Sequence, residues 1–416
     1  MDKLAIEGGK QVRTKPFPTV NDTSGRWIGP EEKELVMQVL DSGHLNRVGG
    51  KYVARFESDF AHKFGAKYAI ASTSGTAAIH IALGALEVGP GDEIITTPIT
   101  DMGTIIPILL CNAIPRFTDV DPLTGNLTPQ SIIQHITKRT KGIIAVHLFG
   151  QPCDLDEIMR IARKHNLWVV EDCCQAHGAV YHGKKVGTIG TMGCYSFQQS
   201  KQMTTGDGGM TITNNEHLAY RARLFSDKAW PRDGKSRGHL FLAPNYRMTE
   251  MQGAIGIAQL KKLDKNLAQR RKTADRLTRL IQKIPGVNPP KLIDGIKHSY
   301  WIYAFTIDEK KLGVSNREFH TALAAEGIPV NLGYIPVPIF EYEVLKYKKT
   351  YGKTQCPFGC AKSGKKNIQY RSADYPNASW TSHNLLTISW NEGITDLDVD
   401  DIASAIRKVV TLLARD

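Results

Sequence analysis

The feature that most constrains the fold is a regular alternation of short apolar runs with helical stretches, which begins near residue 68. The apolar, β-rich runs cover residues 68–72, 93–97, 116–120, 142–147 and 167–171. The helical stretches between them cover residues 76–86, 129–137 and 154–164. Strands that alternate with helices form a mostly parallel sheet with helices on its faces. With further strands expected at 192–197 and 209–214, the sequence predicts an α/β domain.

The length and the second half of the chain indicate a second domain. The 416 residues are two to three times the usual length of one domain. A long helix is predicted from about 249 to 284, ending before the stop signal Pro285-Gly286. A strand at 300–307, a helix at 316–326, a strand at 328–332 and a final helix at 397–413 fit a smaller α+β domain.

We therefore expect three parts along the chain: an irregular N-terminal arm (1–29), a large domain (30–260) and a small C-terminal domain (261–416). The small domain includes a long loop at 342–382, rich in Gly, Pro, Lys and Tyr and without a clear period. Loops of this length are usually functional or mobile.

The composition excludes several classes of protein. Apolar residues make up 41% and charged residues 23%, so the chain can bury a large core and is not disordered. The longest apolar run, 105–111, is far shorter than the ~20 residues that span a bilayer, and the N-terminus lacks a signal-peptide stretch. Seven scattered cysteines argue against a disulfide scaffold. We expect a cytoplasmic protein without a membrane partner.

The net charge of +12 raises the question of an anionic partner. Eight basic residues and no acidic one lie within 345–373, and eight basic residues lie within 261–279 beside Asp264 and Asp275. No helix-turn-helix, zinc-finger or RNP-like pattern accompanies them, so nucleic acid is not an expected partner. A solvated basic surface is favoured over attraction of a phosphorylated substrate.

Three polar segments that follow apolar runs could carry chemistry. Residues 72–77 (STSGTA) join a strand to a helix, where backbone N–H groups and hydroxyls can hold a phosphate, although a simple turn and cap explains them as well. Residues 169–178 end a strand in Glu171-Asp172, at the edge where open α/β sheets bind ligands. A helix cap is the structural alternative there, and the adjacent cysteine pair lacks the spacing of a zinc site.

The third segment, residues 196–209 (SFQQSKQMTTGDGG), contains Lys201 just before a glycine-rich turn. A lone lysine is usually a solvated surface residue. A turn rich in glycine can bend sharply, however, and can present an amine to a cofactor.

These segments, in this order and with residues 244–248 (PNYRM), resemble the DegT/DnrJ/EryC1/StrS family of sugar aminotransferases, which are fold-type I enzymes of pyridoxal 5′-phosphate (PLP). The resemblance covers nearly the whole chain, from the region 43–64 to Ser389-Trp390-Asn391-Glu392. It implies a fold-type I PLP-dependent transferase. The large domain would hold a mostly parallel, mixed seven-stranded sheet, and the smaller C-terminal domain would be α+β.

The resemblance also implies roles. Lys201 would form a Schiff base with PLP and later move protons, and a lysine with this task must spend time neutral. Asp172 would pair with the pyridinium nitrogen, and Gln175 would donate a hydrogen bond to the phenolic oxygen of the ring.

The phosphate of the cofactor would be bound by Gly75, Thr76 and Ser196. Asn245 would reach the phosphate of the neighbouring subunit, which implies a homodimer with shared active sites.

No metal is expected, because the C-x₃-C pair of Cys356 and Cys360 has no second ligand pair.

Two departures from the family pattern concern the same cavity. Many relatives place an aromatic residue over the PLP ring, but the matching segment, 97–103, offers Asp101 or Met102 instead. Met102 could pack on the ring through its thioether. Asp207 stands where glutamate is common in the glycine-rich loop.

The implied reaction moves an amino group from L-glutamine or L-glutamate to a cyclic ketone. The 342–382 loop resembles members that act on cyclitols, so a keto-sugar or keto-cyclitol such as scyllo-inosose, in aminocyclitol or antibiotic biosynthesis, is expected. The alternative is a nucleotide-linked keto-sugar for a surface polysaccharide or antibiotic sugar, whose diphosphate would suit the basic loop. His147 and Tyr334 are candidate substrate contacts.

Other PLP chemistry is less favoured. Sugar dehydratases of this family carry histidine in place of the lysine, so Lys201 argues against dehydration. Cysteine desulfuration would need one of the cysteines on a mobile active-site loop. A non-catalytic regulator would need a DNA-binding domain, for which no residues remain.

Overall fold

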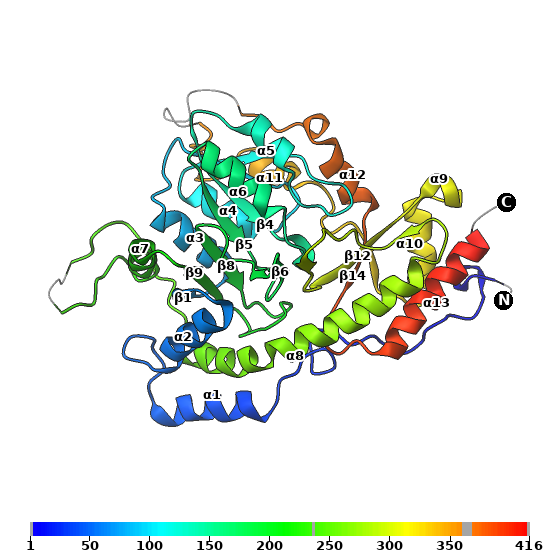
Figure 1. Cartoon of the computed structure of the whole chain (residues 1–416), viewed down its shortest axis with the longest axis horizontal. Coiled ribbons are helices and arrows are strands. Elements are labelled where there is room, and N and C mark those ends of the chain that lie inside the picture. Colours follow the sequence, from blue (N-terminus) through cyan, green and yellow to red (C-terminus); the bar gives the residue numbers. More distant parts are fainter. Residues whose placement is uncertain (1–2, 235–237, 360–367, 414–416) are drawn as a thin grey trace.

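A seven-stranded sheet forms the centre of the larger domain (Figure 1). The computed structural model describes residues 3–234, 238–359 and 368–413. The strand order is β1-β9-β8-β5-β4-β2-β3, in which β9 runs antiparallel to both neighbours and the other pairs are parallel. The strands are β1 (Tyr68–Ser72), β2 (Glu93–Thr96), β3 (Ile114–Phe117), β4 (Thr140–Val146), β5 (Trp168–Asp172), β8 (Met192–Ser196) and β9 (Gly209–Thr213). The predicted mixed, mostly parallel sheet is confirmed.

Helices cover both faces of this sheet. One face carries α3 (Gly75–Ala85), α4 (Met102–Leu110) and α7 (Glu216–Ser226), and the other carries α2 (Tyr52–Phe64), α5 (Pro129–His135) and α6 (Leu155–Lys164). Because side chains alternate along a strand, Val170 of β5 packs with α3 and α7, whereas Val169 packs with α6. This alternation decides the surroundings of the next two residues, Glu171 and Asp172.

The sequence pattern of α2 explains how it docks. Phe56, Phe60 and Phe64 lie four residues apart and are buried in one cluster with Tyr195 and other core residues. The helix ends at Gly65, whose φ of +80° is the left-handed conformation that glycine adopts most easily. The spacing of the three phenylalanines and the position of the glycine thus account for how this helix docks and where it ends.

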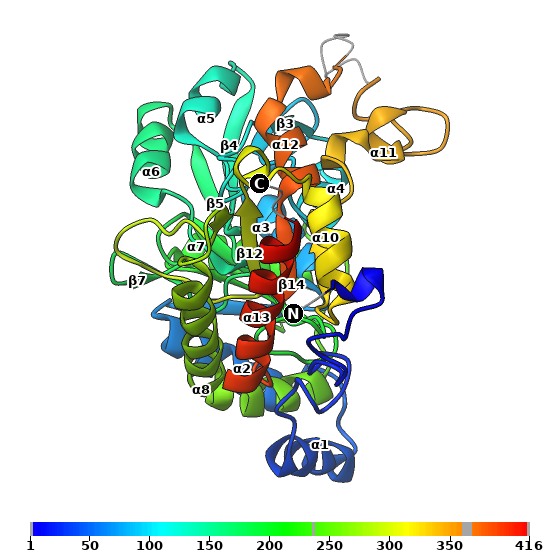
Figure 2. The same cartoon turned by 90° about the vertical axis from the view of Figure 1, so that its right-hand side faces the viewer.

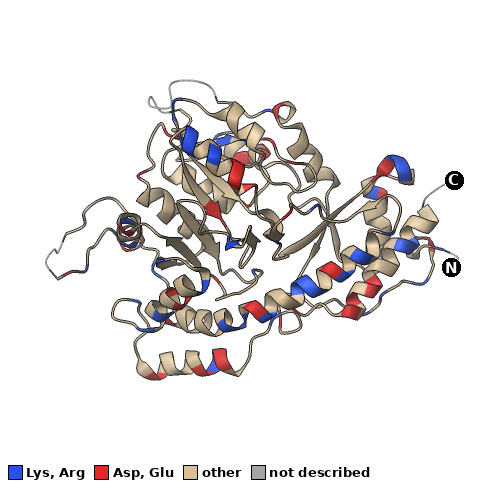
Figure 3. Ribbon diagram, viewed as in Figure 1, with Lys and Arg blue, Asp and Glu red and all other residues tan. Residues whose placement is uncertain are grey.

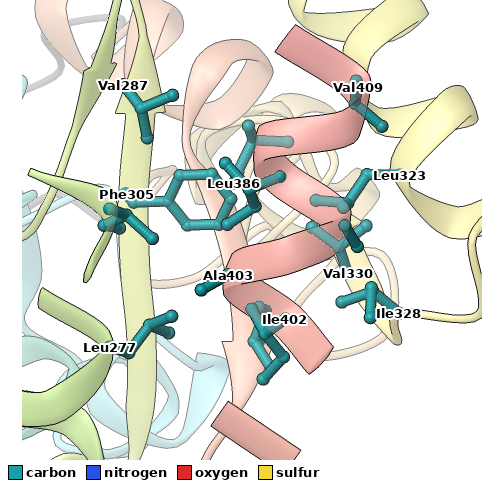
Figure 4. Packing of buried hydrophobic residues seen from close by; sticks show 14 of the residues in the cluster. Leu277, Val287, Phe305, Leu323, Ile328, Val330, Leu386, Ile402, Ala403 and Val409 are labelled. Carbon is teal, nitrogen blue, oxygen red and sulfur yellow. The ribbon is translucent and has the colours of Figure 1, made fainter. Parts of the chain in front are cut away.

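The smaller domain is built on a four-stranded antiparallel sheet of order β10-β12-β14-β13. Its strands are β10 (Val287–Asn288), β12 (Ile302–Ile307), β13 (Val330–Leu332) and β14 (Leu386–Ser389), and its helices are α9 (Glu309–Leu312), α10 (Asn316–Ala325), α12 (Pro376–Asn384) and α13 (Asp396–Leu413). In Figure 4, Phe305 and Leu386 of neighbouring strands point toward Ile402 and Ala403 of α13, all of them buried.

One long helix, α8 (Glu250–Ile281), runs beneath the large domain to the small domain (Figure 1). Its 32 residues span about 48 Å at the usual rise. A capping box between Thr249 and Gln252 begins it. Leu267 packs in the large-domain core and Leu277 in the small-domain core. The predicted boundary at residue 260 falls inside this helix and stays a prediction.

The N-terminal arm follows α8 in the opposite direction, from the small domain to the large one (Figures 1 and 2). Leu4 is buried in the small-domain core, beside the 3-10 helix η1 (Ala5–Glu7). The arm then leads to α1 (Pro30–Ser42), which packs along α8. The arm is therefore tied to both domains.

Acidic side chains accompany the basic stretch on α8 (Figure 3). Lys272 pairs with Asp396 at 3.0 Å, and Arg276 pairs with Asp400 at 2.6 Å. Two cations of α8 thus form salt bridges with α13. Salt bridges of this exposed kind contribute little to stability.

The structure differs from the sequence predictions in three places. Helix α4 was not predicted, because its sequence is apolar throughout, has no helical period and contains Pro107. The third strand, predicted at 116–120, lies two to three residues earlier. The 342–382 loop contains the short helix α11 (Glu343–Lys346) and most of α12, while residues 360–367, with Cys360, lie outside the described residues.

The remaining elements are short. They are a small sheet of β6 (Val180–Tyr181), β7 (Lys184–Lys185) and β11 (Ile296–Lys297), and the 3-10 helices η2 (Leu148–Gly150), η3 (Ile339–Glu341) and η5 (Ser372–Asp374). Within the described ranges, we find no helix with the length and apolar character needed to cross a membrane.

Candidate active site

A cavity of about 370 Å³ opens at the carboxyl edge of the central sheet. This is the edge at which open α/β sheets bind ligands. The large domain contributes the first turns of α3 and α4, the end of β5 and the connection between β8 and β9. The small domain contributes Trp301 and Tyr334. Five of the predicted site residues line the cavity together with Lys201: Gly75, Thr76, Asp172, Gln175 and Ser196.

Asp172 ends β5 on the α3 side of the sheet. Its Oδ2 accepts a hydrogen bond from the Thr104 hydroxyl at 2.8 Å, and its Oδ1 accepts one from the Cys174 N–H at 3.0 Å. Thr104 is itself bonded to Thr100 at 2.8 Å, so the carboxylate is fixed from the first turn of α4. Two donors leave this buried carboxylate with unused acceptor capacity toward the cavity.

Lys201 enters the cavity from the turn that follows β8. Its backbone N–H closes the turn on the Gln198 carbonyl at 2.9 Å. Its Nζ lies 3.7 Å from the centroid of the Trp301 ring, which provides a favourable face for a cation. Desolvation lowers the pKa of Lys201, while the charges of Cys174, Asp101 and Asp172 act in the opposite direction. The amine is thus shifted toward its neutral, nucleophilic form.

The start of α3 forms a compact cradle beside the lysine. The Ser74 side chain caps the helix by accepting from the Ala77 N–H at 3.0 Å, which leaves the N–H groups of Gly75 and Thr76 at the helix mouth. A Cβ on Gly75 would lie 2.7 Å from Ser196 Cβ and 2.9 Å from Cys174 Sγ. Only glycine lets the helix start approach Ser196 this closely, and the result is an anion-binding geometry.

Gln175 is held by contacts at both ends of its amide. Its Oε1 accepts from the Phe149 N–H at 2.8 Å, and its Nε2 donates to the Tyr334 hydroxyl at 3.2 Å. The amide nitrogen carries two hydrogens, so a second donor remains. Burial raises the pKa of Tyr334, which therefore stays a neutral phenol.

Asn245 lies elsewhere. It is exposed on the segment between α7 and α8, where its backbone bridges to Asp227, and it does not line the cavity of its own chain. Exposure is what a residue that serves a neighbouring subunit would require.

Of the two candidates for the position over the ring, Asp101 lines the cavity and Met102 does not. Asp101 lines the cavity and caps α4 by accepting from the Gly103 N–H at 2.7 Å. Met102 packs instead against an apolar cluster on the side of the neighbouring strands. Asp207 of the glycine-rich loop also lines the cavity.

His147 lies on the opposite face of the sheet and does not line the cavity. Its Nε2 donates to Glu171 at 3.1 Å, and its Nδ1 accepts from the Cys153 N–H at 3.1 Å, so both ring nitrogens are engaged. Ligand atoms of His147, Glu171 and Cys173 lie within 4.8 Å of one another, as in a metal site. Glu171, however, already accepts three backbone N–H groups, so we assign no metal to this group.

Sequence reasoning missed three residues that shape the cavity: Trp301, Thr100 and Thr104. Trp301 directly precedes β12 of the other domain, about 100 positions after the lysine, and no local pattern marks it. Thr104 lies in the first turn of α4 and Thr100 lies just before this helix, which was not predicted.

Comparison with known proteins gives one consistent result. The model of the DegT/DnrJ/EryC1/StrS aminotransferase family matches residues 27–363. The spore coat polysaccharide biosynthesis protein SpsC of Bacillus subtilis (strain 168) is 36% identical over 92% of this chain and 95% of its own length.

Two further relatives differ in the substrates that their names state. The GDP-perosamine synthase of Caulobacter vibrioides is 39% identical over 70% of this chain and 78% of its own. A putative L-glutamine:3-amino-2,3-dideoxy-scyllo-inosose aminotransferase of Streptoalloteichus tenebrarius is 33% identical over 98% and 97%.

Solved structures agree with the fold. The aminotransferase from Psychrobacter cryohalolentis superposes with a TM-score of 0.82 at 32% identity, covering 96% of this chain and all of that one. A GDP-4-keto-6-deoxymannose-3-dehydratase solved with a trapped PLP-glutamate geminal diamine gives 0.81 at 26% identity, covering 95% and 100%.

Proposed function

Since the chain belongs to the DegT/DnrJ/EryC1/StrS aminotransferase family and is a PLP-dependent transaminase, we propose that it aminates a cyclic keto-cyclitol or free keto-sugar with L-glutamine or L-glutamate as the donor. One observation carries the proposal. A lysine amine whose pKa is lowered by desolvation shares a cavity with a fixed carboxylate and a helix-start anion cradle.

The residues present fit PLP. Gly75, which has no Cβ, lets the mouth of α3 approach Ser196 closely, and the first N–H groups of this helix favour a phosphate. Asp172 keeps acceptor capacity for a protonated ring nitrogen, and Gln175 keeps one N–H for an oxygen. Each predicted ligand residue of this chain's own cavity thus has a donor or acceptor to offer.

When bound, PLP supplies an electrophilic carbon and an electron sink for the carbon that loses a proton. Lys201 Nζ would take the α-proton of the amino donor and deliver it to the electrophilic carbon that the cofactor supplies, which requires the neutral amine that desolvation favours. Asp172 would hold the ring nitrogen protonated and so keep the sink effective. Trp301 and Tyr334, from the small domain, would close the cavity against water.

We propose a homodimer in which Asn245 of one subunit reaches the cofactor phosphate of the other. Its exposure and its position outside its own cavity support this assignment. Light scattering should give about twice the chain mass, and Asn245→Ala should weaken cofactor affinity without altering that mass.

The charge of the basic loop is weaker support for a nucleotide-linked ring than the sequence alone suggests. Three of its cations are already engaged: Lys346 with Glu341 at 3.1 Å, Lys349 with Glu343 at 2.6 Å and Arg371 with Asp374 at 2.9 Å. Cations paired in this way offer a diphosphate less than their number suggests. The inosose aminotransferase relative, aligned over almost the full length of both chains, supports the same choice.

The second candidate function is amination of a nucleotide-linked keto-sugar. It is favoured by the higher identity, 39%, to a GDP-perosamine synthase, although that alignment covers a smaller share of the chain. The two candidates differ only in the acceptor.

A two-step absorbance experiment tests the proposal. The band of the bound cofactor should disappear when L-glutamine or L-glutamate is added, and a band that persists with every amino acid would contradict transamination. Enzyme charged in this way and freed of donor is then offered acceptors. Return of the band with scyllo-inosose supports the cyclitol assignment, and return only with GDP-4-keto-6-deoxymannose supports the second candidate.

A further inference from the structure

The turn that carries Lys201 is held by side chains from outside the large domain. The carbonyl oxygens of Gln199 and Lys201 both accept from Arg26 Nη2, and Arg26 belongs to the N-terminal arm. The carbonyl between them, that of Ser200, accepts from Trp301 Nε1 at 2.9 Å, and Trp301 belongs to the small domain. Two residues, Arg26 from the N-terminal arm and Trp301 from the small domain, therefore fix three successive carbonyl groups of this turn.

Arg26 is itself anchored by a buried carboxylate. Its Nη1 donates to Glu392 Oε1 at 3.2 Å, and Arg270 Nη2 of α8 donates to Glu392 Oε2 at 2.6 Å. All three residues are at most 2% exposed. Glu392 ends the Ser389-Trp390-Asn391-Glu392 segment, to which neither the cavity nor the proposed chemistry assigns a task.

The ion pairs of Glu392 with Arg26 and Arg270 fix the position of Arg26 more than they add to the stability of the fold. Removing three charges from water is costly, and buried ion pairs of this kind are often no more stabilising than apolar packing. The planar guanidinium of Arg26, by contrast, makes three bonds in fixed directions, which a lysine ammonium on a flexible stem cannot reproduce. Burial lowers the pKa of Arg26 to about 10, so the group remains a cation at neutral pH.

We propose that Arg26, held by Glu392, is a positioning residue for Lys201: it fixes the backbone of the lysine turn so that Nζ reaches the reacting carbons. The inference rests on the role given to Lys201 above. Misplacement of a reacting group by about 1 Å costs roughly 100-fold in rate. The arm and the small domain would therefore affect the rate by positioning Lys201, without touching the substrate.

The test compares Arg26→Lys with Arg13→Lys in the full-length, PLP-loaded protein. Arg13 is a matched control, because it is a buried arginine of the same arm that pairs with Asp398 at 2.6 Å and Asp401 at 2.8 Å, away from the lysine turn. Covalent attachment is measured without turnover. Borohydride reduces the imine between the lysine and the cofactor, and peptide mass spectrometry gives the fraction of residue 201 that carries the label.

Arg26→Lys should lower kcat by about 10-fold to 100-fold with little change in KM, and should lower the reduced fraction at residue 201. Arg13→Lys should leave both near wild type. Equal effects of the two substitutions on kcat and labelling would overturn the inference. A wild-type protein without label at residue 201 would instead overturn the role of Lys201 itself, so the two failures are distinguishable.

A second variant keeps the test decisive if Arg26→Lys does not fold. Trp301→Phe retains an aromatic ring in the cavity and removes the N–H that fixes the Ser200 carbonyl together with part of the indole. It should also lower kcat and the labelled fraction. Unchanged values in this variant would overturn the inference that the turn must be held from outside.

Discussion

Two neighbouring carboxylates at the end of β5 lie on opposite faces of the central sheet and have different hydrogen-bond partners. Glu171 and Asp172 are neighbours at the end of β5, and both carboxylates are buried. Glu171 points to the α6 side and accepts from His147 Nε2 and from the N–H groups of Gly187, Ile189 and Gly190, at 2.5–3.1 Å. Asp172 accepts only a threonine hydroxyl and one backbone N–H, and it lines the cavity.

The difference shows what separates a structural carboxylate from a functional one. A carboxylate has about four acceptor positions, and the protein fills all four on Glu171 but only two on Asp172. The saturated group closes a loop against the sheet. The unsaturated group is able to bind a ligand, and its neighbours keep it in one orientation. Four substitutions sharpen this comparison.

Removal of the amine on the cavity side should have the largest effect on turnover. Lys201→Ala should lower kcat by roughly 10⁴-fold, because it removes the amine that would move the proton. The cofactor should still bind through the helix-start cradle, and absorbance after dialysis measures this. Retained activity in the variant would refute the role of Lys201.

Neutralisation of the cavity carboxylate should have the next largest effect. Asp172→Asn keeps an oxygen for the Cys174 N–H and keeps the shape of the side chain, so the unfolding midpoint should change little. Turnover should fall about 100-fold, as for loss of one preorganised electrostatic partner. Steady-state kinetics and thermal unfolding, measured on the same sample, separate the two effects. An unaltered kcat would place Asp172 with Glu171 as a structural residue.

The sequence predicted the parts of the site that local spacing encodes. Lys201, Asp172 and Gln175 stand at strand ends and in turns with recognisable residues, and all three meet in the cavity. Trp301 could not be predicted, since it reaches the lysine only through the packing of two domains. Nor could the unequal saturation of Glu171 and Asp172, because the donors to Glu171 come from a loop 16–19 residues later.

The same limit applies to the fold. The strands of the large sheet were predicted from short apolar runs that alternate with helical stretches. Helix α4 carries apolar residues on its exposed side too, at Ile106 and Leu110, and so it lacks the pattern by which a helix is found. The cavity residue Thr104 on α4, and Thr100 just before this helix, were missed for this reason.

A larger side chain at the start of α3 should have a smaller effect, on the affinity for the cofactor. Gly75→Ala would place a methyl group 2.7 Å from Ser196 Cβ, and overpacking of this kind should weaken PLP binding about 10-fold. Gly89→Ala is the control, because a Cβ there meets no atom within 4 Å. Fluorescence titration of the cofactor-free proteins gives both affinities. Equal affinities for the two variants would contradict a phosphate cradle at this helix start.

Substitution on the saturated side should change turnover least and stability most. Glu171→Gln replaces two acceptor oxygens by one, so at least one buried N–H loses its partner and the new amide faces backbone donors. The free energy of unfolding should fall by about 3 kcal/mol, while kcat of the folded enzyme stays within about twofold of wild type. Urea unfolding at pH 7 and kinetics at low temperature measure the two quantities. If Glu171→Gln lowered kcat as far as Asp172→Asn does and left stability unchanged, the distinction between a structural Glu171 and a functional Asp172 would be wrong. The carboxylate of Glu171 would then take part in the reaction although all of its acceptor positions are occupied.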